Sequence, residues 1–354
     1  MQGRRELRCL IAAGGTAGHV LPALAVADAL RERGVAVSFA GSPDRVEARL
    51  VPEAGYELDV FRVSGLPRRP GIELARSLAL AAAAPVSCAR ILARRRPDVV
   101  LGAGGFVAGP MVLAARLRGT PAALTEADRH LGLSNRLALP FAQRLFLAYP
   151  PDVHIDGKVR VTGRPIPARS RPVARADARR MFSLPEQGPV LLVMGALAGA
   201  HALNELAVDA FAESGPAVLH LSGEREFDSL RARVARRDYV LVASTDRFGA
   251  ALGAADLALS RAGGTVWELA AAGLPAVLVP YPHATGDHQY LNAVYFDEGA
   301  IVVREDDIAR VPGVVRSLLD DPARLERMRA AMLRKARPDA ADAIAEGLIE
   351  LASA

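Results

Sequence analysis

Cysteine is scarce in this chain of 354 residues, which contains only Cys9 and Cys88. Two cysteines, one of them in a predicted core strand, make neither a disulfide framework nor a zinc site. His283 and His288 also lack partners at the spacing of zinc ligands. We therefore expect a reducing, cytosolic setting and a protein that uses no metal and no cofactor.

The sequence also lacks an apolar run that could cross a membrane. Its most apolar longer segment, residues 78–89, is far below the roughly 20 residues that a spanning helix needs, and it contains Pro85. The short apolar stretch at the N-terminus runs into a glycine turn and does not end like a signal peptide. We expect a protein that does not cross a membrane, although it can touch one.

The chain contains little lysine: Lys158 and Lys335 are the only lysines among its 44 lysine and arginine residues. The net charge of +5 fits either a solvated basic surface or attraction to phosphates and anionic lipid, and the charge total alone favours the solvated surface. We expect no nucleic acid partner. With 51% hydrophobic and 23% charged residues, the chain is typical of a globular protein long enough for two domains.

Strand and helix signals alternate along both halves of the chain. The predicted strands cover residues 8–13, 35–40, 58–63, 98–101, 122–125, 144–148 and 159–161 in the first half, and residues 190–194, 217–221, 239–242, 256–259, 276–279 and 300–303 in the second. This alternation predicts two Rossmann-like α/β domains, each with a mostly parallel sheet and helices on both faces.

A stretch without periodicity separates these halves. Residues 164–175 contain several prolines and arginines, which indicates a linker between a first domain of residues 1–163 and a second of residues 176–338. The C-terminal stretch, residues 340–354, follows Pro338 and carries one apolar helical stripe. We expect this last helix to pack back on the first domain.

Two glycine-rich turns follow predicted strands, one at residues 14–19 and one at residues 261–268. Each reads as strand, glycine turn and helix start, which leaves backbone N–H groups free at a helix N-terminus, where phosphate binds well. Because one such turn lies in each half, the pair suggests a cleft that closes on a phosphorylated substrate from both sides.

His19 ends the first of these turns, at the carboxyl end of the first predicted strand. Open α/β sheets bind ligands at this end, and histidine can take up a proton near neutral pH. A histidine that only hydrogen-bonds a loop carbonyl is the structural alternative. The position in the expected crevice favours a functional role.

Two further groups follow strands in the first half. Gly105 belongs to the glycine-rich run at residues 102–110, which either brings backbone N–H groups to the crevice or forms a tight turn before a helix. Glu126 and Asp128 end another strand, and carboxylates there could serve acid–base chemistry or bind hydroxyls. Asp128 could equally be a helix cap.

In the second turn, Thr265 and Glu268 have the spacing of a capping box. Glu268 could also accept hydrogen bonds from ribose hydroxyls, as acidic residues do in nucleotide-binding folds. Arg261 could neutralise a diphosphate or lie on the surface. Residues 287–292 begin the next helix and could face the same ligand.

The basic segment at residues 71–96 combines a helical apolar pattern with several arginines, among them Arg76 and Arg90. It could lie at a lipid surface or cover the sheet as an ordinary helix. Composition alone favours the ordinary helix.

These motifs, taken in order along the chain, resemble the MurG family, the undecaprenyl-pyrophosphoryl-muramoyl-pentapeptide N-acetylglucosaminyltransferases of peptidoglycan synthesis. The resemblance covers essentially the whole chain, and its first and last motifs are quite specific. It is carried by residues 14–25, 104–110, 161–165, 260–275 and 283–292.

The resemblance implies a GT-B architecture, in which two doubly wound, Rossmann-like domains face each other across a cleft. It implies inverting transfer of GlcNAc from UDP-GlcNAc to the C4 hydroxyl of MurNAc-(pentapeptide)-pyrophosphoryl-undecaprenol, which converts lipid I to lipid II. The implied location is peripheral, at the inner leaflet on the cytoplasmic face of the cell membrane. Residues 71–96 would then be the membrane-facing patch, which reverses the preference above.

The resemblance also implies roles for particular residues. It makes His19 the base, adds Glu126 to the catalytic residues, and puts Glu268 on the ribose and Gln289 near the sugar. The residues that it assigns to binding the donor or the acceptor are Thr16, Ala17, Gly18, Gly105, Asp128, Arg164, Gly199, Thr245, Arg261, Gly263, Gly264, Thr265, Glu268, Gln289 and Asn292.

Some positions depart from the family pattern, which bears on the choice of donor sugar. Residues 125–128 read Thr-Glu-Ala-Asp where the family has His-Glu-Gln-Asn. Leu197 replaces a serine, and Pro167 replaces an arginine for which Arg164 or Arg169 could substitute.

The alternatives are a related GT-B transferase with another lipid or small-molecule acceptor, and a catalytically silent UDP-sugar-binding protein. The presence of His19 argues against the silent protein. A dinucleotide oxidoreductase is disfavoured because the first turn lacks the Gly-x-Gly-x-x-Gly spacing and no acidic residue closes the second strand.

Overall fold

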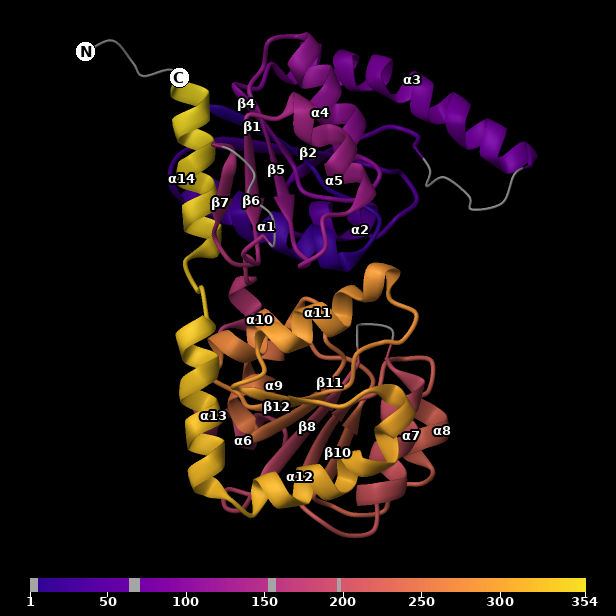
Figure 1. Ribbon diagram of the computed structural model, residues 1–354, viewed down its shortest axis with the longest axis vertical. Coiled ribbons are helices and arrows are strands. Elements are labelled where there is room, and N and C mark those ends of the chain that lie inside the picture. Colours follow the sequence, from indigo (N-terminus) through magenta and orange to yellow (C-terminus); the bar gives the residue numbers. More distant parts are fainter. Residues whose placement is uncertain (1–5, 64–70, 152–156, 196–198) are drawn as a thin grey trace. The chain divides into compact units, whose positions relative to one another are not determined.

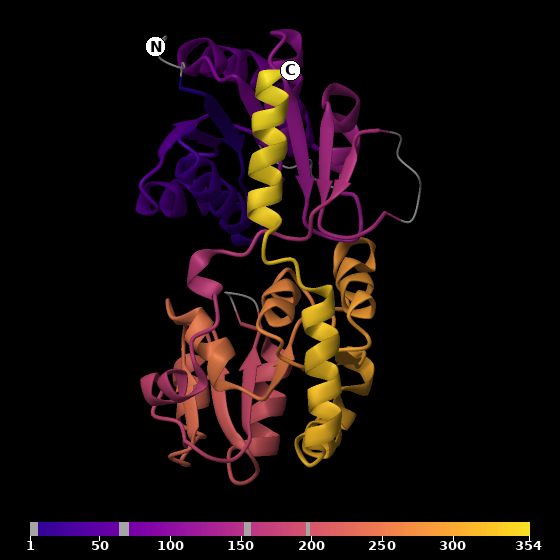
Figure 2. The ribbon, with the colours of Figure 1, turned by 90° about the vertical axis from the view of Figure 1, so that its left-hand side faces the viewer.

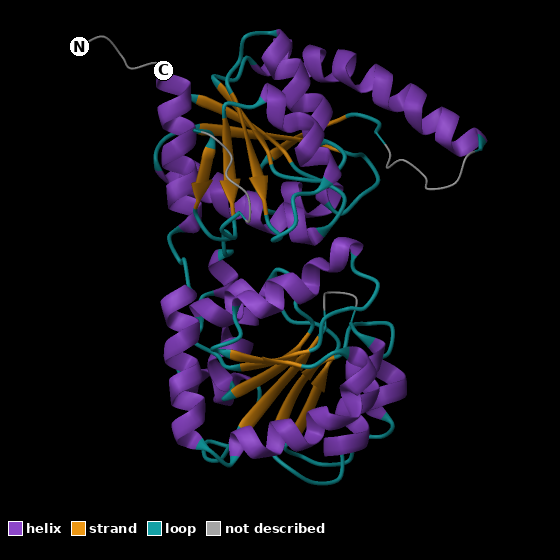
Figure 3. Ribbon diagram, viewed as in Figure 1, coloured by secondary structure: helices purple, strands orange, loops and turns teal. Residues whose placement is uncertain are grey.

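The computed structural model describes residues 6–63, 71–151, 157–195 and 199–354. The chain divides into two compact units. Unit 1 comprises Met1–Pro167 and Pro338–Ala354, and unit 2 comprises Ala168–Arg337. Figure 1 labels the elements of both units, and Figure 3 shows that each consists of a sheet flanked by helices. The α/β fold class expected from the sequence is confirmed.

Unit 1 contains, in the described part of the chain, a seven-stranded parallel sheet in the order β3-β2-β1-β4-β5-β6-β7. Its strands are β1 (Arg8–Ala12), β2 (Ala36–Gly41), β3 (Glu57–Val60), β4 (Val99–Gly102), β5 (Ala122–Glu126), β6 (Arg144–Leu147) and β7 (Val159–Val161). Its helices are α1 (Ala17–Glu32), α2 (Glu47–Glu53), α3 (Ile72–Arg95), α4 (Ala108–Leu117), α5 (Leu133–Ala138) and α14 (Ala340–Ser353), with a 3-10 turn at Leu139–Phe141.

Unit 2 contains, within the described residues, a six-stranded parallel sheet in the order β10-β9-β8-β11-β12-β13. Its strands are β8 (Val190–Met194), β9 (Ala217–Leu221), β10 (Tyr239–Val242), β11 (Leu257–Ser260), β12 (Ala276–Leu278) and β13 (Ala300–Val302). Its helices are α6 (Arg175–Met181), α7 (His201–Phe211), α8 (Phe227–Arg231), α9 (Phe248–Ala254), α10 (Thr265–Ala271), α11 (His288–Tyr295), α12 (Val311–Leu319) and α13 (Pro322–Lys335), with 3-10 turns η2 (Ala168–Ser170), η3 (Thr285–Asp287) and η4 (Glu305–Arg310).

Each of the predicted strands is present, with its ends moved by at most a few residues. The side chains of β1 explain why its sequence is apolar throughout. Cys9 and Ile11 point into a core shared with α1 and α14, whereas Leu10 and Ala12 point into a core shared with α3 and α4. A strand of a parallel sheet that is covered on both faces buries both sets of side chains.

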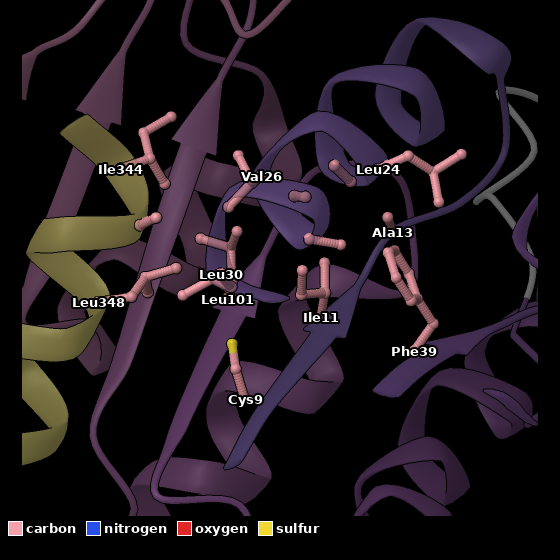
Figure 4. Packing of buried hydrophobic residues seen from close by; sticks show 14 of the residues in the cluster. Cys9, Ile11, Ala13, Leu24, Val26, Leu30, Phe39, Leu101, Ile344 and Leu348 are labelled. Atoms are coloured by element: carbon pink, nitrogen blue, oxygen red, sulfur yellow. The ribbon is translucent and has the colours of Figure 1, made fainter. Parts of the chain in front are cut away.

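The C-terminal helix α14 packs on the first of these cores. Ile344 and Leu348 both belong to this core, and Figure 4 shows Leu348 beside Leu101 and near Leu30. Gly347 meets the ring of Phe146 so closely that a Cβ there would require a shift. Figure 2 shows the helix running along the strands of unit 1. The last helix therefore belongs to the unit that begins the chain, not to the one that precedes it in sequence.

Chain order reverses between neighbouring strands once in each sheet. In unit 1 this occurs between β1 and β4, where Ala12 pairs with Gly102. In unit 2 it occurs between β8 and β11, where Met194 pairs with Ser260. Ligands of open α/β sheets bind outside the carboxyl ends of the strands at such a switch point. The loops that follow β1, β4 and β11 are the glycine-rich turns singled out in the sequence.

The basic segment at residues 71–96 forms the single helix α3. Arg94 and Arg95 pair with Asp59, and Arg95 also pairs with Glu57, so these two arginines tie the helix to β3. Arg76 lies outside the residues whose side chains are described. Among the described residues, no helix has both the length and the apolarity needed to cross a bilayer.

Candidate active site

The turn after β1 is held by a carboxylate that the sequence did not single out. Glu47, the first residue of α2, is fully buried and accepts hydrogen bonds from the backbone N–H of Gly15 (3.0 Å) and of Ser42 (2.9 Å). Gly14 leaves the space for this carboxylate, because a Cβ there would overlap it. Glu47 carries no sequence signal of its own, because it follows the second strand by several residues and belongs to no recognised motif.

The glycine turns after β1 and β4 touch through their backbones. Gly104 and Gly105 both have left-handed backbone angles, with φ of +93° and +75°. A Cβ on Gly105 would overlap the carbonyl oxygen of Gly14, and one on Gly104 would overlap the imidazole of His19. The pairing of Ala12 with Gly102 places the two loops side by side, and glycine lets them close up.

His19 lies in the first turn of α1, half-buried, with Nδ1 at 3.3 Å from the Thr16 hydroxyl oxygen. Burial is the main cause that lowers its pKa below the ordinary value, and the positive charge of Arg164 adds to it. A hydrogen bond to the backbone of Gly14 opposes the shift. The ring is therefore tied to its loop, and the lowered pKa favours its neutral form, which can accept a proton. The functional role of His19 stays a prediction.

Arg164 follows β7 and reaches the start of α1. Its guanidinium Nη2 donates a 2.6 Å hydrogen bond to the carbonyl oxygen of Gly18, and the residue is buried. Gly18, His19, Glu126 and Arg164 line one small cavity of about 20 Å³, together with apolar residues such as Phe146. The structure thus brings these four predicted site residues together within unit 1.

Glu126 is the last residue of β5 and is 8% exposed. Its carboxylate accepts hydrogen bonds from the amides of Ala127 (3.0 Å), Asp128 (3.3 Å) and Gly132 (2.9 Å), and from the side chain of Asn135 (3.0 Å). Burial raises its pKa and these hydrogen bonds oppose the rise. Glu126 therefore organises the loop that leads into α5.

Asp128 does not cap a helix, which corrects one of the two interpretations above. Helix α5 begins at Leu133, its N-cap residue is Gly132, and no side chain of the described part of the chain caps it. The charge of Asp128 raises the pKa of both His19 and Glu126. The binding role expected for Asp128 stays a prediction.

In unit 2, the expected capping box is wrong. Helix α10 begins at Thr265 with Gly264 as its N-cap, so the Thr265 hydroxyl is one residue too far along to cap it, and no side chain of the described residues does so. One carboxylate oxygen of Glu268 instead accepts a 2.5 Å hydrogen bond from the hydroxyl of Ser170. The turn at Gly263 and Gly264 is partly exposed at the end of β11.

Arg261 is not a surface arginine, because its side chain is only 10% exposed. Its guanidinium donates to the carbonyl oxygens of Val279 (3.2 Å) and Pro280 (3.3 Å) and pairs with Glu305. These contacts join the loops that follow β11 and β12.

Gln289 and Asn292, on α11, also hold the turn after β11. The Gln289 side-chain oxygen accepts from the amides of Ala262 (3.3 Å) and Tyr281 (2.9 Å). Asn292 is fully buried and donates to the carbonyl oxygen of Ala262 (3.3 Å). The structure thus places Arg261, Gln289 and Asn292 around one turn.

Gly199 and Thr245 follow β8 and β10 at the carboxyl edge of this sheet. Gly199 has a φ of +80°, and a Cβ there would overlap the carbonyl oxygen of Ser222. The Thr245 hydroxyl accepts from the amide of Arg247 (3.0 Å). Leu197 lies outside the described residues.

A buried polar network, which the sequence did not indicate, supports the loop at Gly199. His220 on β9 is fully buried, with its two ring nitrogens at 2.9 Å from the Tyr239 hydroxyl and from the Asn204 side-chain oxygen. Asn204 donates in turn to the Ser222 carbonyl (2.9 Å) and to Glu226 (2.9 Å). A single histidine in an apolar strand has no sequence signal that separates such a network from an ordinary core position.

The buried position of His220 in this network leads us to expect that the free energy of unfolding falls in acid. Burial lowers the pKa of His220 to about 4, whereas in the unfolded chain it is about 6.5. Between these values the unfolded state binds more protons, so stability falls as the pH falls. From pH 6.5 to 4.5 the wild type should lose about 2 kcal/mol more unfolding free energy than His220→Gln, measured by urea unfolding. Equal losses in the two proteins would contradict this assignment.

Comparisons with known proteins cover both units. The N-terminal domain family of glycosyltransferase family 28 matches residues 9–147, and its C-terminal domain family matches residues 190–344. Relatives from Acidithiobacillus ferrooxidans (43% identity, 97% of each chain) and Methylococcus capsulatus (40%, 98% of this chain and 99% of the relative) carry one name. That name is UDP-N-acetylglucosamine–N-acetylmuramyl-(pentapeptide) pyrophosphoryl-undecaprenol N-acetylglucosamine transferase.

Solved structures agree with this grouping. The crystal structure of MurG from Acinetobacter baumannii has a TM-score of 0.76 at 27% identity and covers 97% of this chain and 99% of its own. A calicheamicin glycosyltransferase has a TM-score of 0.70 at 19% identity, covering 98% of this chain and 99% of its own, and so shows a shared fold only.

Proposed function

Since this chain belongs to glycosyltransferase family 28, we propose that it transfers N-acetylglucosamine from UDP-N-acetylglucosamine to N-acetylmuramyl-(pentapeptide) pyrophosphoryl-undecaprenol. One observation carries the proposal: relatives of that name are 40–43% identical over at least 97% of the chain. The match therefore extends over both units.

The chemistry is a direct displacement at the anomeric carbon of the donor sugar. His19 takes the proton of the acceptor C4 hydroxyl while that oxygen bonds to the anomeric carbon. The bond from this carbon to the UDP oxygen breaks, and its electron pair leaves with UDP, so the anomeric configuration inverts. The lowered pKa of His19 supports its role, because a general base must be neutral before it accepts the proton.

The acceptor side of this proposal lies in unit 1. The first backbone N–H groups of α1, at Ala17 and Gly18, would bind the acceptor pyrophosphate beside Thr16 and Gly105. Asp128 would favour the imidazolium that forms on His19, because its negative charge raises the pKa of that ring. We assign Glu126 to shaping the 127–132 loop and Arg164 to holding the start of α1.

The donor side lies in unit 2. Glu268 would accept hydrogen bonds from the ribose, while the amides of Gly263, Gly264 and Thr265 would bind the diphosphate. The amide nitrogen of Gln289 can donate to the sugar while its oxygen holds the turn. Arg261 and Asn292 would keep this turn in place. Gly199 and Thr245 would line the carboxyl edge of the same sheet beside the donor.

The lipid acceptor implies that the reaction takes place at a membrane surface. We propose peripheral binding at the cytoplasmic face of the cell membrane, with α3 as the contacting helix. Exposed Arg90 and Val86 on its described part combine positive charge with apolar surface, as interfacial helices do.

The test is an assay of the purified chain with radiolabelled UDP-GlcNAc and lipid I. We expect labelled lipid II with lipid I as acceptor and no labelled product with diacylglycerol. UDP-GalNAc in place of UDP-GlcNAc tests the donor sugar, and we expect little transfer from it. Product with diacylglycerol alone would mean a different acceptor, and UDP binding without any product would mean a silent binding protein.

A further inference from the structure

Ser170 lies where the sequence showed only an aperiodic linker. It ends the 3-10 turn η2, is 2% exposed, and its hydroxyl is 2.5 Å from the Glu268 carboxylate oxygen Oε1. An ionised carboxylate can only accept hydrogen bonds, so the serine is the donor. A buried hydroxyl therefore binds the carboxylate assigned to the ribose, across 98 residues of sequence.

Backbone contacts fix the segment that carries this hydroxyl. The amide of Val173 donates to the carbonyl oxygen of Gly249 (3.2 Å), on helix α9. A Cβ on Gly249 would overlap the Arg171 carbonyl oxygen, and one on Gly253 would overlap the Val173 carbonyl oxygen. Two glycines one helical turn apart thus let the segment lie directly on α9. Backbone contacts with α9 therefore fix the segment that follows Ser170.

We propose that Ser170 is a positioning residue for nucleotide binding: it holds the Glu268 carboxylate in the orientation that receives the ribose hydroxyls. The inference rests on the proposed function, which puts the ribose at Glu268. A carboxylate offers about four acceptor sites, so it can bind Ser170 and the ribose together. Holding the side chain before the nucleotide arrives reduces the entropy that binding would otherwise cost.

The test compares UDP with 2′,3′-dideoxyuridine diphosphate, which lacks both ribose hydroxyls, by calorimetry on the full chain. Ser170→Ala should bind UDP roughly 3–10-fold more weakly, the effect of losing one hydrogen bond to a held carboxylate. Its affinity for the dideoxy nucleotide should equal that of the wild type. In the transfer assay, KM for UDP-GlcNAc should rise while kcat changes little.

Three variants complete the design. Ser170→Thr keeps the hydroxyl and should restore most of the UDP affinity. Ser229→Ala, on α8, removes an exposed hydroxyl that donates to the Glu226 carbonyl and should leave both affinities unchanged. In a Glu268→Gln background, Ser170→Ala should not weaken UDP binding further, because the carboxylate that Ser170 holds is already absent.

Several results would overturn the proposal. An equal loss of affinity for both nucleotides would mean that Ser170 acts elsewhere, and tighter UDP binding would mean that it competes with the ribose. If Glu268→Gln weakened UDP binding but Ser170→Ala did not, the positioning role of Ser170 would be rejected and the ribose site at Glu268 would stand. Unchanged UDP binding in Glu268→Gln would reject the ribose site itself, and the role of Ser170 with it.

Discussion

Replacing His19 with alanine should reduce turnover about 10²–10⁴-fold, the usual effect of losing a general base. UDP affinity should stay nearly unchanged, because the proposed nucleotide ligands all lie in unit 2, whereas His19 lies in unit 1. The measurements are kcat from lipid II formation and the dissociation constant of UDP by calorimetry. Turnover equal to that of the wild type would remove His19 from the mechanism.

The pH profile provides an independent check on the same residue. Burial and Arg164 lower the pKa of His19, so its neutral, proton-accepting form persists below the ordinary value of about 6.5. In the wild type, kcat/KM should therefore fall only as the pH drops through a value below 6.5. This limb should vanish in His19→Ala.

Gly105→Ala should cost the enzyme at least about 10²-fold in activity, the effect expected when a site is displaced by about 1 Å. The added Cβ would overlap the Gly14 carbonyl oxygen, so the turns after β1 and β4 must move apart. The φ of +75° adds strain for any residue with a side chain. Together these effects should destabilise unit 1 by about 2–4 kcal/mol, measured by urea unfolding.

Gly119→Ala separates the effect of backbone strain from the effect of overlap with the Gly14 carbonyl oxygen. Gly119 follows α4 with a φ of +73°, but a Cβ there would meet no atom of the described residues within 4 Å. Gly119→Ala should therefore lower the free energy of unfolding by only about 1 kcal/mol, the cost of a positive φ, and keep full activity. If Gly105→Ala behaved in the same way as Gly119→Ala, contact between the two glycine turns would not matter for the reaction.

The elements that the sequence predicted well share one property: their signals are local. Strands such as β8 and β9 are short apolar runs between turn residues, and both have the expected bounds. Glycine turns follow strands at the switch points of the two sheets. The sequence predicts this position, because the order of strands and helices along the chain indicates the topology. The capping box failed although its spacing was correct. Helix α10 starts where long-range contacts hold the preceding turn, among them those of Gln289 and Asn292.

The sequence by itself determined the alternation of strands and helices, the glycine turns and the family, because each depends on neighbours along the chain. Only the tertiary structure decided which polar groups meet. Gly15 and Glu47 are 32 residues apart, Ser170 and Glu268 are 98 apart, and Gly18 and Arg164 are 146 apart. Such pairs form because parallel strands carry distant segments to one edge of a sheet, and no local pattern records which side chains arrive there.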